Sequence, residues 1–369
     1  MTRRDVYLSP GDPLRLGVLM DLPPRFGDVG VRVYELVRDE YVAAGRFERG
    51  VELMVKVCDG PPAGPIRNTT DGYHWLCDQG CLGIVGPNHS DSNIALTPHV
   101  EQRRVPLMAL GASAQMLSPH VFSIAWGSIP DDAHLCASWM VQHGYRRCTV
   151  TWDKAHHSAE YVRHFRNAAK RAGIRILSDE RFSQLLGDKL GEHMQETIRE
   201  HRALKPDAIV HFGTGDTASH WARRVNEAGW DVPRIMNGAF FGVYFPEYIA
   251  GFEGWCGTTM WDDDNQVLAD FRRRYAQRYG DSPPAEMLGH YRDAMVALLE
   301  GATLAPLLTP DGLRQGLEDV RMVAAACGGP RTIIGFGPGD HRGHKGADIM
   351  VVRRVKNGQV VMDARYQAF

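Results

Sequence analysis

Short apolar runs alternate with longer helical patterns along most of this chain of 369 residues. Runs rich in β-branched or apolar residues, such as LRLGVLM (14–20) and VELMVKV (51–57), flank stretches such as 29–45, where apolar residues recur at helical spacing. Buried parallel strands joined by crossover helices produce this alternation. The sequence therefore predicts an α/β fold with parallel sheets.

The alternation occurs twice. The first series adds strands at 82–86 and 105–110, and the second series begins near residue 130. In the second series we expect helices at 131–143, 158–172, 188–202 and 217–228, with strands at 147–153, 174–177, 208–213 and 234–238. Because a single hydrophobic core rarely serves so long a chain, two domains are expected.

The pattern changes after residue 260. Two long helices are expected at 266–279 and 285–300, followed by a Gly-rich end in which Asn357-Gly358 is a strong hairpin signal. Several helices should end at glycine, as in RAG (171–173) and EAG (227–229), because glycine readily adopts the left-handed conformation that closes a helix.

Composition argues against two classes of partner. The chain has 42 Lys and Arg against 44 Asp and Glu, a net charge of -2, and the basic residues are scattered. Nucleic acid and anionic membrane are therefore poor partners. The start, MTRRDVYLSPGDP, lacks the apolar core of a secretory signal, so the chain as written is expected in the cytoplasm. A periplasmic or extracytoplasmic lipoprotein requires a start farther upstream.

The seven cysteines form no paired CxxC motifs, which suits a reducing compartment better than a disulfide framework. Cys77 and Cys81 are four residues apart and could share a helix face, so a disulfide or half of a metal site is conceivable. The simpler interpretation is two small, semi-buried thiols, because no second ligand pair lies near them in sequence.

One strand end is unusually polar. The segment GIVGPNHSDSNIA (83–95) runs from an apolar strand through small and polar residues into a helical pattern. Ser90, Asp91 and Ser92 are common N-cap types, so helix capping explains them. Backbone N–H groups and Ser90 at the same helix start can also bind a polar or anionic ligand group. The two roles are compatible, and Ser90 is the strongest candidate.

An ordered series of phrases resembles the type I periplasmic binding proteins, in particular their branched-chain amino acid and amide binding group. The phrases are LRLGVLMDL (14–22), GIVGPNHSDSNIALTPHVEQRRVPLMALGAS (83–113), FSIAWGSIPDDAHLCASWM (122–140), PDAIVHFGTGD (206–216), FRRRYAQRYGDSPPAE (271–286) and IIGFGPGDHRG (333–343). The resemblance implies two Rossmann-like lobes with parallel sheets, joined by a three-crossover hinge that closes on a ligand. The expected lobes are 12–127 with 259–333, and 128–258 with 334–366.

The resemblance also assigns ligand contacts in the first lobe. It places a ligand-contacting serine at the position of Ser90. In the turn GASAQ (111–115), it implies that Gly111, Ala112 and Ser113 offer backbone N–H groups and a hydroxyl. This turn follows an expected strand, as ligand-binding turns of parallel sheets do.

In the second lobe this sequence departs from the family. Relatives often have aromatic residues at or near the positions of His157 and Thr214, and amino acid binders have a carboxylate near Ala239. Without that carboxylate a ligand ammonium would lack a charge partner, and burying an unpaired charge is costly. Phe240 and Phe241 therefore favour an amide, aromatic or apolar acid over a standard amino acid. His157 is expected to be a neutral hydrogen-bonding wall of the site.

Two functions fit this resemblance. The first is the substrate-binding component of an ABC importer, whose partner is the transporter permease. The second is a cytosolic ligand sensor like the amide-responsive regulators, which acts on a regulatory partner. A homodimer is left open in both cases.

Neither catalysis nor a cofactor is expected. The chain has no GxxxxGK[ST] or GxSxG motif, and FGTGD (212–216) lacks the third glycine of a dinucleotide fingerprint. We expect no metal, because neither the His156-His157 pair nor HRGH (341–344) alone offers three or four convergent ligands. A hydrolytic enzyme that uses the first pair with Asp153 is a remote alternative.

Overall fold

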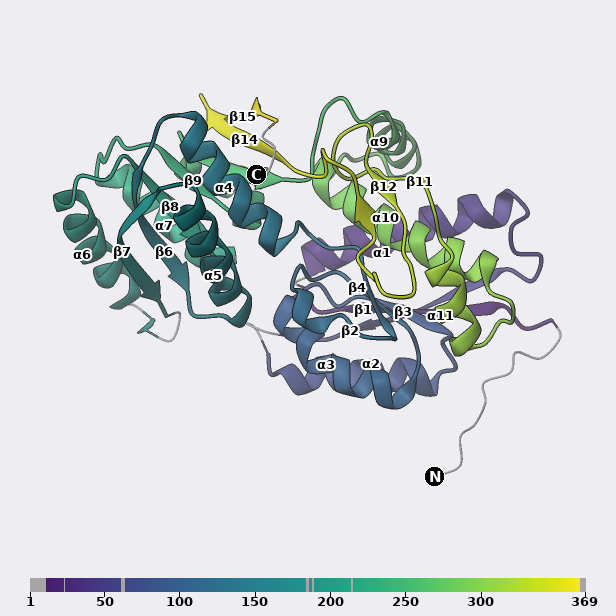
Figure 1. The fold of residues 1–369 in the computed structure, drawn as a ribbon. Coiled ribbons are helices and arrows are strands. Elements are labelled where there is room, and N and C mark those ends of the chain that lie inside the picture. The colour runs from purple at the N-terminus through teal and green to yellow at the C-terminus, as the bar shows by residue number, and fades with distance from the viewer. Residues whose placement is uncertain are drawn as a thin grey trace. The chain divides into compact units, whose positions relative to one another are not determined.

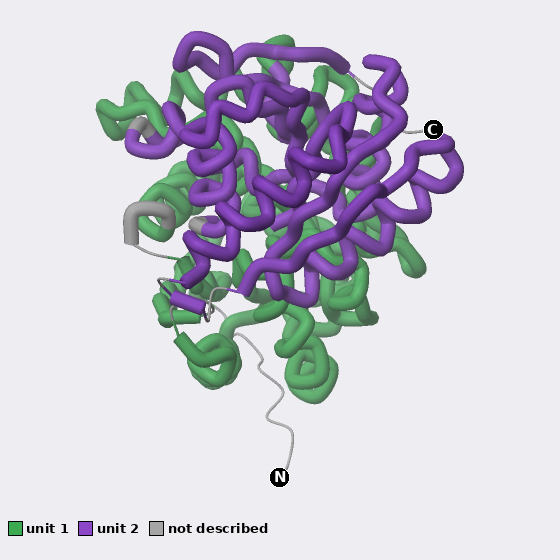
Figure 2. Tube along the Cα trace, turned by 90° about the vertical axis from the view of Figure 1, so that its left-hand side faces the viewer, with its two compact units in different colours: residues 1–126, 263–349 green, residues 127–262, 350–369 purple. Residues whose placement is uncertain are grey.

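The computed structural model describes residues 11–22, 24–60, 64–183, 186–187, 189–213 and 215–365. The chain divides into two compact units, which Figure 2 shows in green and purple. Unit 1 comprises Met1–Trp126 and Asp263–Ile349, and unit 2 comprises Gly127–Asp262 and Met350–Phe369.

Unit 1 contains a five-stranded parallel sheet with the strand order β2-β1-β3-β4-β5 (Figure 1). Its strands are β1 (Leu14–Met20), β2 (Val51–Val57), β3 (Gly83–Val85), β4 (Leu107–Ala109) and β5 (Val121–Ser123). Its helices are α1 (Pro24–Ala43), α2 (Ile66–Asp78), α3 (Ser90–Arg103), η1 (Ala114–Met116), α9 (Gln266–Tyr279), α10 (Ala285–Leu304) and α11 (Pro310–Glu318).

Helices α2 and α3 pack on one face of this sheet, and α1 and α10 lie on the other (Figure 1). A buried cluster joins the first pair of helices to the strands through Tyr73, Leu76, Leu96 and Ile84. Because all five strands are parallel, their carboxyl ends lie at one edge of the sheet, where ligands bind in such folds.

Unit 1 also contains a small antiparallel sheet of β11 (Val323–Ala324), β12 (Ile333–Ile334) and β13 (His344–Lys345). Residues 334–349, which the expected lobe boundaries place in the second lobe, lie in unit 1. The reason is this strand pairing, since β12 pairs with β11 and β13 pairs with β12.

Unit 2 contains a seven-stranded sheet with the order β15-β14-β10-β9-β8-β6-β7, in which only β14 and β15 are antiparallel to their neighbours. Its strands are β6 (Arg147–Asp153), β7 (Arg175–Phe182), β8 (Ala208–Phe212), β9 (Arg234–Met236), β10 (Cys256–Thr259), β14 (Val351–Lys356) and β15 (Gln359–Ala364). Its helices are α4 (Ile129–Gln142), α5 (His156–Arg171), α6 (Lys189–Ala203), α7 (Gly215–Glu227), η3 (Gly238–Tyr244), α8 (Pro246–Ile249) and η4 (Ala250–Phe252).

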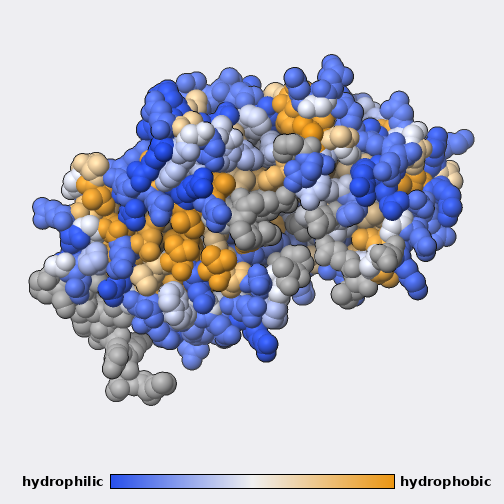
Figure 3. All heavy atoms as spheres, turned by 180° about the vertical axis from the view of Figure 1, so that it is seen from behind, coloured by the Kyte–Doolittle hydropathy of each residue, from blue (hydrophilic) through white to orange (hydrophobic). Residues whose placement is uncertain are grey.

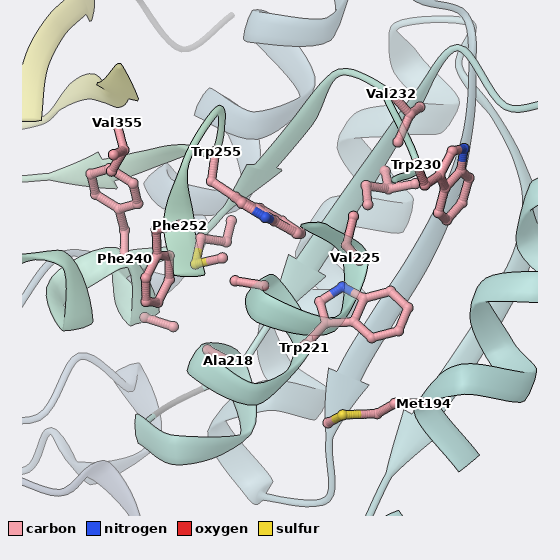
Figure 4. Close-up of a cluster of buried hydrophobic side chains, with 14 of the residues drawn as sticks. Met194, Ala218, Trp221, Val225, Trp230, Val232, Phe240, Phe252, Trp255 and Val355 are labelled. Carbon is pink, nitrogen blue, oxygen red and sulfur yellow. The ribbon is translucent and has the colours of Figure 1, made fainter. Parts of the chain in front are cut away.

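Large aromatic side chains fill one layer of unit 2. Trp221, Trp255, Phe240 and Phe252 are fully buried and belong to one cluster, shown in Figure 4. Burying each such side chain contributes roughly 1.5–3 kcal/mol relative to exposing it. This cluster joins α6, α7 and η3 to the sheet.

The predicted α/β class with parallel sheets is confirmed. Strands 14–20, 51–57 and 147–153 match the prediction to the residue. The predicted hairpin is also present, with Asn357 and Gly358 at φ values of 54° and 70° between β14 and β15. The sequence reasoning did not identify α2, α11 or β10.

The molecular face shown in Figure 3 is mostly hydrophilic, with hydrophobic side chains gathered in patches. Within the described ranges, no helix is both long and apolar enough to cross a bilayer. Cys77 and Cys81 are buried free thiols, as the simpler interpretation predicts, so they form no disulfide. Burial raises their pKa values to about 11 and about 12.

Candidate ligand-binding site

The loop after β3 in unit 1 leads directly into α3, whose first residue is Ser90. The N-cap is His89, and its side chain makes no capping hydrogen bond, so the predicted capping by Ser90, Asp91 or Ser92 is wrong. The Ser90 hydroxyl instead accepts a hydrogen bond of 3.0 Å from the backbone N–H of Ala112. This bond connects the loops that follow β3 and β4. It also places the N-terminus of α3, which favours polar or anionic groups, at the carboxyl edge of the sheet.

Gly111 permits this close approach of the two loops. A Cβ atom at this position would lie 2.8 Å from the Ser90 Cα atom and 3.0 Å from its Oγ atom, closer than real contacts allow. Ser113 is the N-cap of η1, and its hydroxyl accepts a hydrogen bond of 3.1 Å from the Gln115 N–H. The structure thus brings Ser90, Gly111 and Ala112 together, and Ser113 continues the same turn.

A second connection at this edge was missed by the sequence reasoning. Asp21, directly after β1, accepts hydrogen bonds from the backbone N–H of Asn88 at 2.7 Å and from its side-chain amide at 3.3 Å. The Tyr291 hydroxyl donates to the Asn88 Oδ1 atom at 3.2 Å. The signal in the sequence was Asp21 itself, which directly follows an apolar strand. A carboxylate buried at such a position needs hydrogen-bond donors from neighbouring loops.

In unit 2, His157 is the second residue of α5 and is buried. The strand before it ends at Asp153, whose Oδ1 atom accepts a short hydrogen bond from the Ser158 hydroxyl. The predicted residue His157 therefore lies just beyond the carboxyl end of β6. In sequence it falls between Asp153 and Ser158, which are hydrogen-bonded to each other.

The ends of β8 and β9 are connected by Asn237, which the sequence reasoning did not single out. Its Oδ1 atom accepts from the Gly213 N–H at 3.2 Å and from the Ala239 N–H at 3.4 Å. Its amide group donates to the Gly213 carbonyl at 3.2 Å. The predicted contact Thr214, directly after this glycine, is outside the described residues.

Two polar side chains approach Gly213. A Cβ atom there would lie 2.6 Å from the His211 Nε2 atom and 3.0 Å from the Asp153 Oδ2 atom. The His211 Nδ1 atom is hydrogen-bonded to the Thr151 hydroxyl at 2.9 Å, whereas no described group hydrogen-bonds to its Nε2 atom. Burial lowers the pKa of His211 to about 3, so the ring is neutral near pH 7. The carboxyl edge of unit 2 therefore holds a neutral imidazole beside a carboxylate.

Ala239 and Phe240 lie in η3, at the end of β9. Ala239 is buried and its backbone is fixed by Asn237. Phe240 is fully buried in the aromatic cluster of Figure 4 and contacts Phe252 edge-on, so its side chain is part of the core. Phe241 is only half-buried and lies 5.7 Å from the Tyr244 ring. The aromatic side chain nearest to solvent in this pair is thus Phe241.

This chain is similar to known proteins in both sequence and structure. A family model described as periplasmic binding protein matches residues 15–359. A type 1 periplasmic binding protein from Bordetella pertussis Tohama I has a similar structure, with a TM-score of 0.81 at 20% sequence identity, over 96% of this chain and 100% of that one.

Two further solved structures are similar over nearly their whole length. A leucine binding protein from Thermotoga maritima has a TM-score of 0.77 at 19% identity, covering 96% of this chain and 99% of that one. A solute binding protein from R. palustris, in complex with benzoate, has a TM-score of 0.77 at 17% identity, covering 97% of each chain. The search of curated proteins gave no match.

Proposed function

Because this chain belongs to the periplasmic binding protein family, we propose that it captures a small organic molecule as the substrate-binding component of an ABC transporter. The observation that carries this proposal is the paired construction of the two carboxyl edges. In each unit one side chain, Ser90 or Asn237, connects the loops after two neighbouring parallel strands. Such connections fix the geometry of the loops before a ligand arrives, which lowers the entropic cost of binding.

We further propose that the ligand is an amide, an aromatic acid or another apolar acid. The family resemblance implies a carboxylate near Ala239 in amino acid binders, and without it an ammonium group would lack that partner. The half-buried Phe241 and Tyr244 add aromatic surface at the same strand end. Aromatic pairs contribute about 0.5–1.5 kcal/mol beyond their buried area. Among the similar structures, the R. palustris protein holds benzoate.

A thermal-shift panel tests the ligand class. The panel contains benzoate, benzamide, an aliphatic amide, leucine and isoleucine, each added to the reduced full chain. A ligand at about 100 times its Kd stabilises the folded protein by roughly 2.7 kcal/mol. We expect an increase in melting temperature with an aromatic acid or amide. An increase with leucine or isoleucine alone would contradict the argument from Ala239.

A matched pair of variants tests the site in unit 1. Ser90→Ala removes the acceptor of the Ala112 N–H, whereas Ser118→Ala removes a hydroxyl that donates to Glu101 at 2.6 Å before β5, at the opposite edge of the sheet. We expect weaker binding of the ligand identified by the panel in Ser90→Ala only, by about five- to tenfold, as for one lost hydrogen bond of ~1 kcal/mol or slightly more. Equal affinity in both variants would remove Ser90 from the site.

The seven free thiols favour a second candidate, a cytosolic ligand sensor that acts on a regulatory protein. Free cysteines persist more readily in a reducing compartment. Fractionation of cells that express the native gene with its own upstream sequence separates the two proposals. Recovery outside the cytoplasmic membrane supports the transporter component, and recovery in the cytosol supports the sensor.

A further inference from the structure

Three side chains of unit 1 form a cluster with metal-ligating chemistry: Asp293, Cys327 and His344. One ligand atom from each lies within 4.8 Å of those of the other two. The three residues come from α10, from the loop between β11 and β12, and from β13. Asp293 and Cys327 are buried, and the His344 side chain is nearly so. None of the three is among the carboxyl-edge residues described above.

Backbone contacts fix the cluster in place. Asp293 accepts hydrogen bonds from the N–H groups of Ala326 and Cys327 at 2.8 and 2.9 Å, so the loop is held against α10. Gly289 lies one turn earlier on this helix, and a Cβ atom there would already contact the Cys327 Sγ atom at 3.4 Å. The absence of a larger side chain at Gly289 thus leaves room for the thiol beside the helix.

The spacing and the donor set suit zinc. The His344 Nε2 atom lies 3.1 Å from the Asp293 Oδ2 atom. Two ligands of a tetrahedral zinc ion, each about 2.1 Å from the metal, are about 3.4 Å apart. The present hydrogen-bonded pair therefore needs only a small shift to hold an ion in place of its shared proton. Thiolate, imidazole and carboxylate groups are all ligands that zinc takes in proteins.

His290 supplies a second, independent observation. It is 1% exposed and precedes Asp293 by three residues on α10, on the same helix face. No described group hydrogen-bonds to either of its ring nitrogens, and the centroid of the ring lies 4.1 Å from that of Trp126, with the two planes tilted by 41°. An imidazole buried without partners is costly, and a metal ion or a metal-bound water provides the partner it lacks.

We propose that unit 1 binds one Zn²⁺ ion through the Asp293 carboxylate, the Cys327 thiolate and the His344 imidazole. The Arg292 guanidinium donates to the other carboxylate oxygen, Asp293 Oδ1, at 2.7 Å. The Oδ2 atom remains on the side of His344. The ion cross-links α10 to the β11–β13 sheet in the segment that precedes the passage into unit 2.

Proton release accompanies this binding. Burial raises the pKa of the Cys327 thiol well above its ordinary value, so the metal-free protein holds a proton on sulfur. The ion must displace this proton to form the zinc–sulfur bond, and the proton passes to solvent.

Cobalt titration of the reduced, chelator-treated full chain tests the site, because Co²⁺ reports thiolate ligation by a charge-transfer band in the near ultraviolet. We expect the band to saturate at one equivalent and to be bleached by Zn²⁺. Cys327→Ser should abolish it, and the matched control Cys81→Ser, at another buried free thiol of unit 1, should retain it. Absence of the band in the parent protein, or its persistence in Cys327→Ser, overturns the proposal.

Histidine variants locate the ion by a second readout. His344→Gln should weaken zinc binding at least tenfold, whereas His341→Gln, which alters a ring bonded to the Ser118 carbonyl, should not. At 100 times its Kd, zinc should raise the melting temperature of the parent by roughly 5–10 °C. The half-buried pair His74 and His99, 3.1 Å apart, is the competing nitrogen-only site. Zinc stabilisation that is lost in His74→Gln and kept in His344→Gln would contradict the proposal.

Discussion

Gly86 in unit 1 and Gly213 in unit 2 both lie at the carboxyl edge of a sheet, but they differ in which atoms surround them. In unit 1 the three atoms nearest to a Cβ atom built at Gly86 would all be backbone atoms of Leu19, with its carbonyl oxygen at 2.0 Å. In unit 2 the space at Gly213 is occupied by side chains, the imidazole of His211 and the carboxylate of Asp153. The space at Gly86 is therefore limited by the chain path, and the space at Gly213 by side chains that substitution can change.

This difference indicates where specificity resides. Backbone N–H groups at the edge of unit 1 can bind polar groups of many ligands, because every residue except proline supplies one. The edge of unit 2 carries an imidazole, a carboxylate and the aromatic ring of Phe241, and we propose that these groups select a ligand by its chemistry. The departures from the family pattern at His157 and Ala239 also lie in unit 2. We therefore expect changes in unit 2 to alter ligand choice, and changes in unit 1 to alter affinity for all ligands.

The largest expected effect on stability concerns Phe240 in η3, which belongs to the core, whereas its neighbour Phe241 is only half-buried. Phe240→Ala removes a fully buried ring and should lower the free energy of unfolding by about 3–5 kcal/mol. Urea unfolding followed by tryptophan fluorescence measures it well, since of the eight tryptophans only Trp75 and Trp126 lie in unit 1. A loss below 1 kcal/mol would show that Phe240 is not part of the core.

The next effect compares two strand-end glycines. Gly86 has a φ of 99° and no room for a methyl group, so Gly86→Ala should destabilise unit 1 by about 2–4 kcal/mol. Gly238→Ala, at the end of β9, meets nothing within 4 Å and should change stability by less than about 0.5 kcal/mol. Similar unfolding midpoints for the two variants in urea would remove the contrast between the edges.

A pH-dependent effect concerns His211. Its pKa is lowered to about 3 by burial, whereas the unfolded chain takes up this proton near pH 6.5. The unfolded state thus binds more protons between these values, so this contribution to stability is complete above pH 6.5 and is lost as the pH falls. Between pH 8 and pH 5 the loss is about 2 kcal/mol.

The variant His211→Asn should lack this pH-dependent loss, so the stability difference between it and the parent should change by that amount between pH 8 and pH 5. Asp132 supplies an opposite control, because burial raises its pKa to about 7 and its contribution to stability is lost as the pH rises toward 7. Parallel pH profiles of the parent and His211→Asn would contradict the assigned environment of this ring.

How far the sequence predicted the structure depended on where the apolar residues lay. Strands β1, β2 and β6 were predicted to the residue because β-branched or apolar residues make up most of each short run. Helix α2 was missed because its buried face includes Thr69 and Gly72, which hide the helical period. Residues 334–349 were assigned to the wrong unit because short strand pairings such as β12 with β13 have almost no signal in sequence.

The candidate site was predicted in part. Ser90, Gly111 and Ala112 follow neighbouring strands, and the strand-end rule was sufficient to bring them together. The role of Asn237 was not visible, because it depends on the position of Gly213, 24 residues earlier in the chain. His211 was likewise missed, since its alternation within an apolar strand looks like ordinary core.

The smallest expected effect on stability tests the specificity of unit 2. Phe241→Ala should lower the unfolding free energy by less than about 1 kcal/mol, because the ring is only half-buried. The affinity of this variant for an aromatic ligand should fall about three- to tenfold, while its affinity for an aliphatic amide should not change. Equal losses for both ligands would assign Phe241 a structural role.

Calorimetric titration of the reduced full chain with benzamide, benzoate and leucine tests the central claim most directly. The account predicts saturable binding of one equivalent of an aromatic acid or amide, with no detectable heat from leucine. Saturable binding of leucine, without binding of either aromatic compound, would contradict it.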